Sequence, residues 1–151
     1  MYFDEEVVLF QSATITQEEA LTKLGNKMLE KNIVNEHFLE NVLKREQTYP
    51  TGLAVNGIGI AIPHTDSEFV IKSQLGFMSL EDPVTFYEMG TLDQEVEVRL
   101  IFMLALKEAH EQLAMLQQLI ELFQKDEVVE QLLKVSDVTN FLDIMAKQNL
   151  N

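Results

Sequence analysis

The chain has 151 residues, a formal net charge of −14 and an apolar content of 46%. This length is typical of one domain with a substantial core, and the composition excludes a disordered chain, a collagen-like rod and a simple coiled coil. The acidic excess disfavours binding to nucleic acid or to an anionic membrane surface, and the absence of cysteine excludes disulfides, thiolate metal sites and a thiol nucleophile.

Neither the N-terminal sequence nor the apolar runs indicate export or a membrane span. Residues 1–6 are acidic and lack the basic region of a signal peptide. The longest apolar run, residues 100–106, is far shorter than the roughly 20 residues that a membrane helix needs. We therefore expect a cytoplasmic protein without membrane insertion, folded as a single domain over residues 1–151.

The first half of the chain predicts a strand, two helices and a second short strand. Residues 7–10 are typical of a strand, and Thr16 with Glu19 forms a capping box before a first helix. Asn35 is a candidate cap for the second helix, which residues 48–52 interrupt. Residues 58–62 form a short β-rich run that stops at Pro63. The expected buried faces of the two helices are Ala20, Leu21, Leu24, Met28 and Leu29, and Phe38, Leu39, Val42 and Leu43.

The second half predicts strands followed by helices. Residues 74–80 and 84–86 are expected strands, and residues 96–106 alternate before becoming fully apolar, which is typical of a strand entering a sheet interior. From about residue 108 the pattern is helical, and Ser136 or Asp137 caps the last helix. The expected stripes are Leu113, Leu116, Leu119, Ile120 and Phe123, then Val128, Val129, Leu132 and Leu133. Together these elements predict an α/β fold with a mixed central sheet covered by helices.

Few residues could carry catalysis, because the chain has three histidines and no Walker loop, dinucleotide fingerprint or serine elbow. Pro63 ends the strand over 58–62, so we expect His64 to emerge at the carboxyl end of that strand, where open α/β sheets place their ligands. A neutral imidazole there can act as a nucleophile. Its position is equally compatible with a loop histidine that has no chemical task.

Three other residues have both a functional and an ordinary interpretation. Arg45 could clamp an anion with its guanidinium, although a cation is also favourable at a helix C-terminus without any further role. His110, at the start of a helix, could donate to a phosphoryl oxygen or could simply be a solvated first-turn residue. We interpret His37 as structural or solvated.

The segments around these residues resemble enzyme IIA of the fructose–mannitol class of the bacterial sugar phosphotransferase system. The resemblance covers essentially the whole chain, and the Tyr49-Pro50-Thr51-Gly52 loop, longer than in typical fructose or nitrogen-regulatory members, is similar to the galactitol branch. The other segments that carry it are Arg45-Glu46, Gly59-Ile60-Ala61-Ile62-Pro63-His64, residues 98–106 and His110-Glu111-Gln112-Leu113.

The resemblance implies a phosphoryl relay on a mixed sheet between helical layers. In this class a histidine accepts a phosphoryl group from the phosphocarrier protein HPr and passes it to a cysteine of enzyme IIB, which works with the membrane component IIC in sugar uptake. Carried over, His64 is the phosphorylated nucleophile, usually through Nε2, and Arg45 lies beside the phosphoryl group. His110 matches a supporting histidine, and Thr51 is a candidate hydroxyl donor. The relay needs no metal and no cofactor, and the acidic surface is expected to aid docking to a basic HPr.

Three alternatives stay open. The first is a nitrogen-related regulatory enzyme IIA that binds other proteins according to its phosphorylation, which the longer loop disfavours. The second is a small metal-dependent hydrolase using His64, Asp66 and His110. The third is a domain of a transcription regulator, which a chain beginning at Met1 without a linker disfavours.

Overall fold

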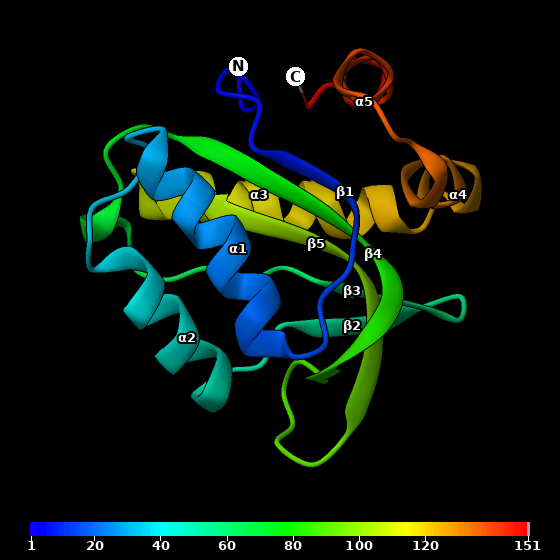
Figure 1. Cartoon of the computed structure of the whole chain (residues 1–151), viewed down its shortest axis with the longest axis horizontal. Helices are drawn as coiled ribbons and strands as arrows, with labels where there is room; N and C mark the ends of the chain where they lie inside the picture. The colour runs from blue at the N-terminus through cyan, green and yellow to red at the C-terminus, as the bar shows by residue number, and fades with distance from the viewer. Residues whose placement is uncertain (151) are drawn as a thin grey trace.

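The computed structural model describes residues 1–150, which form a five-stranded mixed β-sheet with helices on both faces (Figure 1). The sheet order is β1-β4-β5-β3-β2, with β1 parallel to β4, β3 parallel to β5, and antiparallel pairing elsewhere. This arrangement confirms the predicted α/β fold with a mixed central sheet. The strands are β1 (Val8–Ser12), β2 (Gly52–Val55), β3 (Ile58–Ala61), β4 (Gln74–Tyr87) and β5 (Glu95–Ala105).

Helices form a layer on each side of the sheet. Helices α1 (Gln17–Glu30) and α2 (Phe38–Thr48) cover the face toward the viewer in Figure 1, while α3 (Ala109–Phe123), α4 (Asp126–Lys134) and α5 (Val138–Lys147) pack against the other. A short 3-10 helix, η1 (Ser67–Phe69), follows β3. Among residues 1–150, no helix combines the length and the apolar character that crossing a membrane requires.

Strand β5 lies at the centre of the sheet, between β4 and β3. Leu100, Phe102 and Leu104 pack into the cluster with α3–α5, whereas Ile101 and Met103 pack into the cluster with α1 and α2. Both faces of this segment are fully buried, which explains why the sequence stops alternating there.

A bulge at Arg99 divides β5 into two segments. The pairing of β5 with β3 shifts between Val98 and Leu100, and the pairing with β4 shifts across the same point. Because side chains alternate along a strand, one extra residue exchanges the faces. Val96 and Val98 therefore point toward α1 and α2, as Ile101 does beyond the bulge.

Several expected elements differ from the structure in the first half of the chain. The sequence prediction has no strand at β2, yet β2 forms a hairpin with β3 across Asn56-Gly57, whose φ values are 50° and 85°. The Asn-Gly pair between two apolar runs is the signal that indicates such a hairpin. Helix α2 begins at Phe38 with His37 as its N-cap residue, and Asn35 lies in the preceding turn, where its side chain accepts a hydrogen bond from the His37 backbone N–H at 2.9 Å.

Other boundaries are confirmed or corrected by local contacts. Thr16 caps α1 by accepting from the Glu19 N–H at 3.1 Å, and Asp137 caps α5 by accepting from the Asn140 N–H at 2.8 Å. The strands expected at 74–80 and 84–86 are one strand, β4, whose register shifts between Ser79 and Val84.

The predicted apolar stripe on α3 is correct at Leu116, Leu119 and Phe123 but wrong at Leu113 and Ile120. Leu113 and Ile120 are 61% and 38% exposed, while Met115 and Leu122 are buried beside Leu119 and Phe123. Apolar residues surround most of this helix, so periodicity alone permits two faces, and packing on the sheet selects one of them. Leu29, expected in the buried face of α1, is likewise 41% exposed.

The close approach of β3 and β5 leaves no room for a side chain at Gly59. A Cβ at this position would overlap the carbonyl oxygen of Glu97, whereas at Gly25 in α1 it would meet only the end of the Leu39 side chain, at 2.8 Å. We expect Gly59→Ala to lower the free energy of unfolding by about 1–3 kcal/mol. Gly25→Ala should change it little, because a helix-propensity gain of about 1 kcal/mol offsets the movement of Leu39. Urea denaturation measures both, and equal midpoints would contradict the interpretation.

Candidate functional site

The parallel pairing of β3 with β5 brings distant segments to one edge of the sheet. The backbone N–H of Leu104 donates to the carbonyl of Pro63 at 3.0 Å, so the segment leading to His64 runs beside the end of β5. The start of β2 reaches the same edge, because the Ile62 N–H donates to the carbonyl of Thr51 at 3.4 Å. His64 therefore emerges at the carboxyl end of β3, as Pro63 in the sequence predicts.

The ring of His64 is held by its own backbone. The residue is only 9% exposed, and Nδ1 lies 2.9 Å from the carbonyl oxygen of Ile62. Since a carbonyl oxygen can only accept, Nδ1 carries the proton and donates it to this bond. In the neutral ring, Nε2 therefore holds the free lone pair and is the nucleophilic atom.

The surroundings of His64 favour the neutral ring. Burial lowers the pKa of His64 below its ordinary value, and the cationic Arg45 lowers it further. The Ile62 carbonyl and the Asp66 carboxylate act in the opposite direction, but burial is the largest effect. The lone pair on Nε2 is therefore available at neutral pH.

Arg45, in the last turn of α2, presents a guanidinium with open hydrogen-bonding capacity. Its Nε is buried and has no hydrogen-bond partner among residues 1–150, and Nη1 is 4.0 Å from Asp66 Oδ1, too far for a hydrogen bond. The guanidinium stacks over Tyr49, 5.2 Å from the ring centroid. A buried unsatisfied donor calls for a partner, and an oxyanion beside His64 would provide one.

Glu46, for which no role was expected from the sequence, is a buried carboxylate beside the site. Its Oε2 accepts from the Thr51 backbone N–H at 2.7 Å, and Oε1 accepts from the Thr51 hydroxyl at 2.9 Å. Thr51, which the sequence suggested as a hydroxyl donor to the phosphoryl group, thus donates its hydroxyl hydrogen to Glu46. Phe38, Val42 and Glu46 follow at spacings of four on one helix face, a pattern that could have indicated this burial.

His110 and His37 occupy different environments from His64. His110 is exposed in the first turn of α3, which follows β5 at the same edge as His64, and among residues 1–150 no hydrogen bond joins the two rings. His37 is exposed next to α2, with Nδ1 3.0 Å from Glu40 Oε1, in agreement with its interpretation as a surface residue. Within the described residues, no three or more acidic or histidine side chains are grouped to hold a metal ion.

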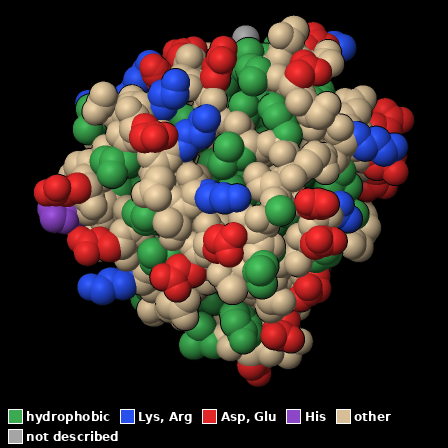
Figure 2. All heavy atoms as spheres, in the orientation of Figure 1, with side chains coloured by type: hydrophobic (Ala, Val, Ile, Leu, Met, Phe, Trp, Pro, Cys, Tyr) green, Lys and Arg blue, Asp and Glu red, His purple; other side chains and the backbone are tan. Residues whose placement is uncertain are grey.

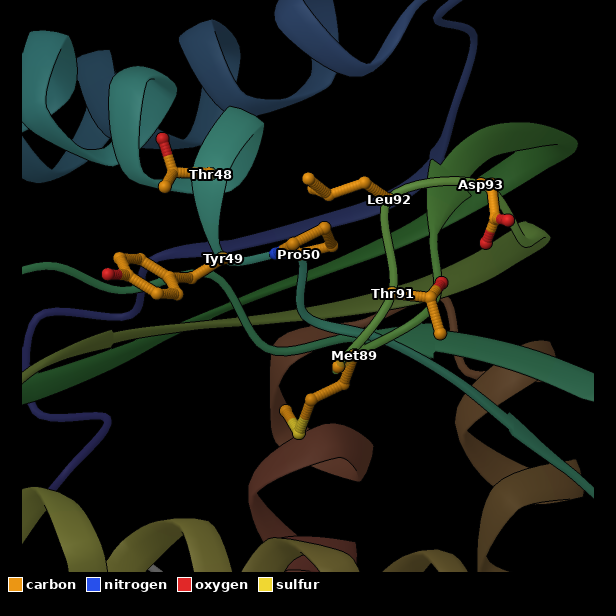
Figure 3. Close-up of a pocket in the computed structure, with 8 residues that line it drawn as sticks. Thr48, Tyr49, Pro50, Met89, Thr91, Leu92 and Asp93 are labelled. Carbon is orange, nitrogen blue, oxygen red and sulfur yellow. The ribbon is translucent and has the colours of Figure 1, made fainter.

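A hollow of about 700 Å³ adjoins the site on the side of Tyr49 (Figure 3). The end of α2 with Tyr49 and Pro50 forms one wall, and the β4–β5 turn with Met89, Leu92 and Asp93 forms the other. The turn is held there because the Met89 N–H donates to the Gly52 carbonyl at 2.8 Å. His64, Arg45 and His110 do not line this hollow, so its walls carry none of the candidate catalytic groups.

Residues 1–148 match the protein family described as "Phosphoenolpyruvate-dependent sugar phosphotransferase system, EIIA 2". The chain is similar to the PTS system galactitol-specific EIIA component of Escherichia coli strain K12, with 28% identity over 123 residues, which cover 82% of this chain and 81% of that protein.

Two solved structures share the fold. One is a chain of the Escherichia coli complex of enzyme IIAMTL with phosphorylated enzyme IIBMTL, with a TM-score of 0.76 and 23% identity, covering 94% of this chain and 95% of that one. The other is the nitrogen regulatory protein IIA-Ntr of Neisseria meningitidis, with a TM-score of 0.73 and 23% identity, covering 92% of each chain. At this identity the likeness shows a common fold, in agreement with the expected sheet between helical layers.

The charges around His64 predict opposite responses to two substitutions. Arg45→Gln removes a cation and should raise the pKa of His64, whereas Asp66→Asn removes an anion and should lower it. In the wild type the ring should titrate below the ordinary value of about 6.5. ¹⁵N NMR of the imidazole nitrogens measures these titrations, with His64→Gln to assign the signal. Shifts of the same sign in both variants would contradict this account.

Proposed function

This chain belongs to the EIIA 2 family of the phosphoenolpyruvate-dependent sugar phosphotransferase system, and we propose that it relays a phosphoryl group on Nε2 of His64. The family assignment agrees with the resemblance found in the sequence, and EIIA components are phosphotransferases. The observation that carries the assignment to His64 is the bond from Nδ1 to Ile62, which leaves Nε2 with the lone pair. The unpartnered Nε of Arg45 supports it as a donor for the incoming oxyanion.

The proposed reaction has two displacements at phosphorus. The lone pair of His64 Nε2 forms a bond to phosphorus while the bond to the donor, phosphorylated HPr, breaks and the donor keeps the electron pair. In the second displacement, a cysteine thiolate of EIIB attacks phosphorus and the N–P bond breaks. His64 keeps its Nδ1–H on Ile62 throughout, so the ring leaves each cycle in the tautomer it entered with. Phosphoryl transfer has a loose transition state, and positioning and charge supply most of the catalysis.

Arg45 is proposed to stabilise the charge on the equatorial oxygens, since a guanidinium matches two phosphoryl oxygens at once. His110 is proposed as a supporting group, because its helix follows β5 at the edge where His64 emerges. Thr51 is proposed to support the site by holding the loop. To donate to a phosphoryl oxygen, its hydroxyl would have to leave Glu46.

The proposed partners are HPr and EIIB, with EIIC in the membrane, and the proposed location is the cytoplasm. The solved complex of IIAMTL with phosphorylated IIBMTL supports EIIB as a partner class. On the face of α1 and α2, acidic and basic side chains are interspersed (Figure 2). The proposed attraction to a basic HPr therefore rests on the net charge of −14 and not on an acidic patch of that face. We also propose that residues 1–151 act as one domain, which the family match over 1–148 supports.

For the sugar, we propose a galactitol-like system. The 28% identical galactitol-specific component of Escherichia coli and the long loop ending in Thr51-Gly52 favour it. A regulatory role like that of IIA-Ntr is the alternative, and the common fold is compatible with both. For the alternative of a metal-dependent hydrolase, residues 1–150 contain no group of three or more side chains that could bind the metal ion.

Phosphoryl uptake tests the role of His64. With phosphoenolpyruvate, enzyme I and HPr, the intact mass of the wild type should gain one acid-labile phosphoryl group. His64→Ala should gain none, and Arg45→Gln should react about 100-fold more slowly, as for the loss of one oxyanion donor. His110→Ala should retain uptake, and His37→Ala is the matched control with an exposed histidine. Uptake in His64→Ala, or none in the wild type with competent HPr, would refute the relay.

Transfer to purified EIIB tests the sugar class. Phosphorylated protein should lose its phosphoryl group faster to a galactitol-specific EIIB than to a mannitol-specific EIIB, because association rates among closely related complexes vary over about one to three orders of magnitude. The measurement is the decay of the phosphorylated mass after mixing. Equal and slow decay with every EIIB would favour the regulatory alternative.

A further inference from the structure

Glu46 is an acidic residue that the proposed relay chemistry does not use, although it lies beside the site. It is 4% exposed, and burial raises its pKa, while the two hydrogen bonds from Thr51 act in the opposite direction. It forms no ion pair within residues 1–150. A carboxylate without a cation is costly to bury, and an apolar side chain would continue the face of Phe38 and Val42 more favourably.

Hydrogen bonds made by two intervening residues, Thr51 and Ile62, lead from Glu46 to the ring of His64. The carboxylate accepts two bonds from Thr51, at 2.7 and 2.9 Å. The Thr51 carbonyl accepts from the Ile62 N–H at 3.4 Å, and the Ile62 carbonyl accepts from Nδ1 of His64 at 2.9 Å. Thr51 is therefore hydrogen-bonded to the residue whose carbonyl accepts from the His64 ring.

The same loop also positions Arg45. The Tyr49 N–H donates to the Arg45 carbonyl at 2.6 Å, and the Tyr49 ring stacks against the guanidinium. Residues 49–51 are thus attached to α2 at two points, the Tyr49 backbone and the Thr51 contacts with Glu46. Releasing the second attachment would free the loop next to both groups that handle the phosphoryl group.

We propose that Glu46 is a positioning residue for phosphoryl transfer: through Thr51 and Ile62 it holds the His64 ring in the tautomer with free Nε2 and keeps Arg45 beside it. A carboxylate suits this task because it accepts from the Thr51 N–H and O–H together. A glutamine amide could still accept from the Thr51 N–H, but it would have to donate to the Thr51 hydroxyl instead of accepting from it, and both bonds would lose the strength that the carboxylate charge gives them. The inference rests on the proposed relay at His64 for its kinetic consequence, whereas its structural consequence at the His64 ring is independent of that relay.

Four variants distinguish the effect of the Glu46–Thr51 hydrogen bonds on the site from an effect on overall stability. Glu46→Gln weakens both bonds at nearly constant volume by removing the charge, Thr51→Val removes the hydroxyl bond alone, and Thr51→Ser retains both. Glu40→Gln, on the exposed side of the same helix, is the matched control. Thermal unfolding identifies any variant that does not fold. If Glu46→Gln does not fold, Thr51→Val still tests the proposal.

The first readout is ¹⁵N NMR of the unphosphorylated protein. Glu46→Gln and Thr51→Val should show His64 as a mixture of tautomers, whereas Thr51→Ser and Glu40→Gln should match the wild type. The second readout is the kinetics of phosphoryl uptake from phosphorylated HPr. Glu46→Gln should lower kcat about 10–100-fold, as for a misplaced catalytic group, with KM for HPr unchanged.

The outcomes distinguish this proposal from the relay itself. Lower thermal stability with an unchanged His64 tautomer and unchanged kcat would assign Glu46 a purely structural role and overturn the proposal. If the wild type accepts no phosphoryl group but Glu46→Gln still alters the tautomer, the relay fails and the positioning of His64 stands. Normal kcat and a normal tautomer in folded Glu46→Gln and Thr51→Val would overturn the positioning while the relay stands.

Discussion

The carbonyl of Ile62 accepts the Nδ1–H of His64 at 2.9 Å, and this bond decides which ring nitrogen keeps a free lone pair. Burial of the ring alone would lower its pKa but would leave either nitrogen free to carry the proton. The carbonyl removes that freedom, because it can pair only with a protonated Nδ1. Pro63, which has no N–H to continue the pairing, lies between the two residues just after β3 ends at Ala61, and here the ring reaches the backbone of its own segment.

The site combines groups that the interior of a protein ordinarily disfavours. His64 is buried, Glu46 is a buried carboxylate, and Arg45 has a buried donor without a partner. Each of these costs folding free energy. The two fully apolar clusters on either side of the sheet offset this cost, since every residue of the central segment 100–105 is fully buried.

The sequence is most informative where one physical pattern dominates. The apolar run 100–106 predicts the central strand, Pro63 predicts the strand end at His64, and Thr16 and Asp137 predict their caps, because each depends on local chemistry. The phase of α3 could not be predicted in this way, since apolar residues occur around most of the helix and the sheet selects Met115 over Leu113. Glu46 shows the same limit at the site. Its partner Thr51 lies beyond a loop, and only the tertiary structure reveals that the Thr51 hydroxyl is directed toward it.

The return of the β4–β5 turn onto β2 has a consequence for aggregation. Strand β2 is at the edge of the sheet, where unpaired backbone groups can recruit a strand from another molecule. At the start of β2, Gly52 forms a β-bridge with Glu88, and its carbonyl accepts from the Met89 N–H. The strand ends after only four residues, at the Asn56-Gly57 turn. Little of this edge is therefore left open to another strand. In the proposed relay, HPr and EIIB meet this protein in turn, and a largely covered edge limits lasting strand-to-strand association during those encounters.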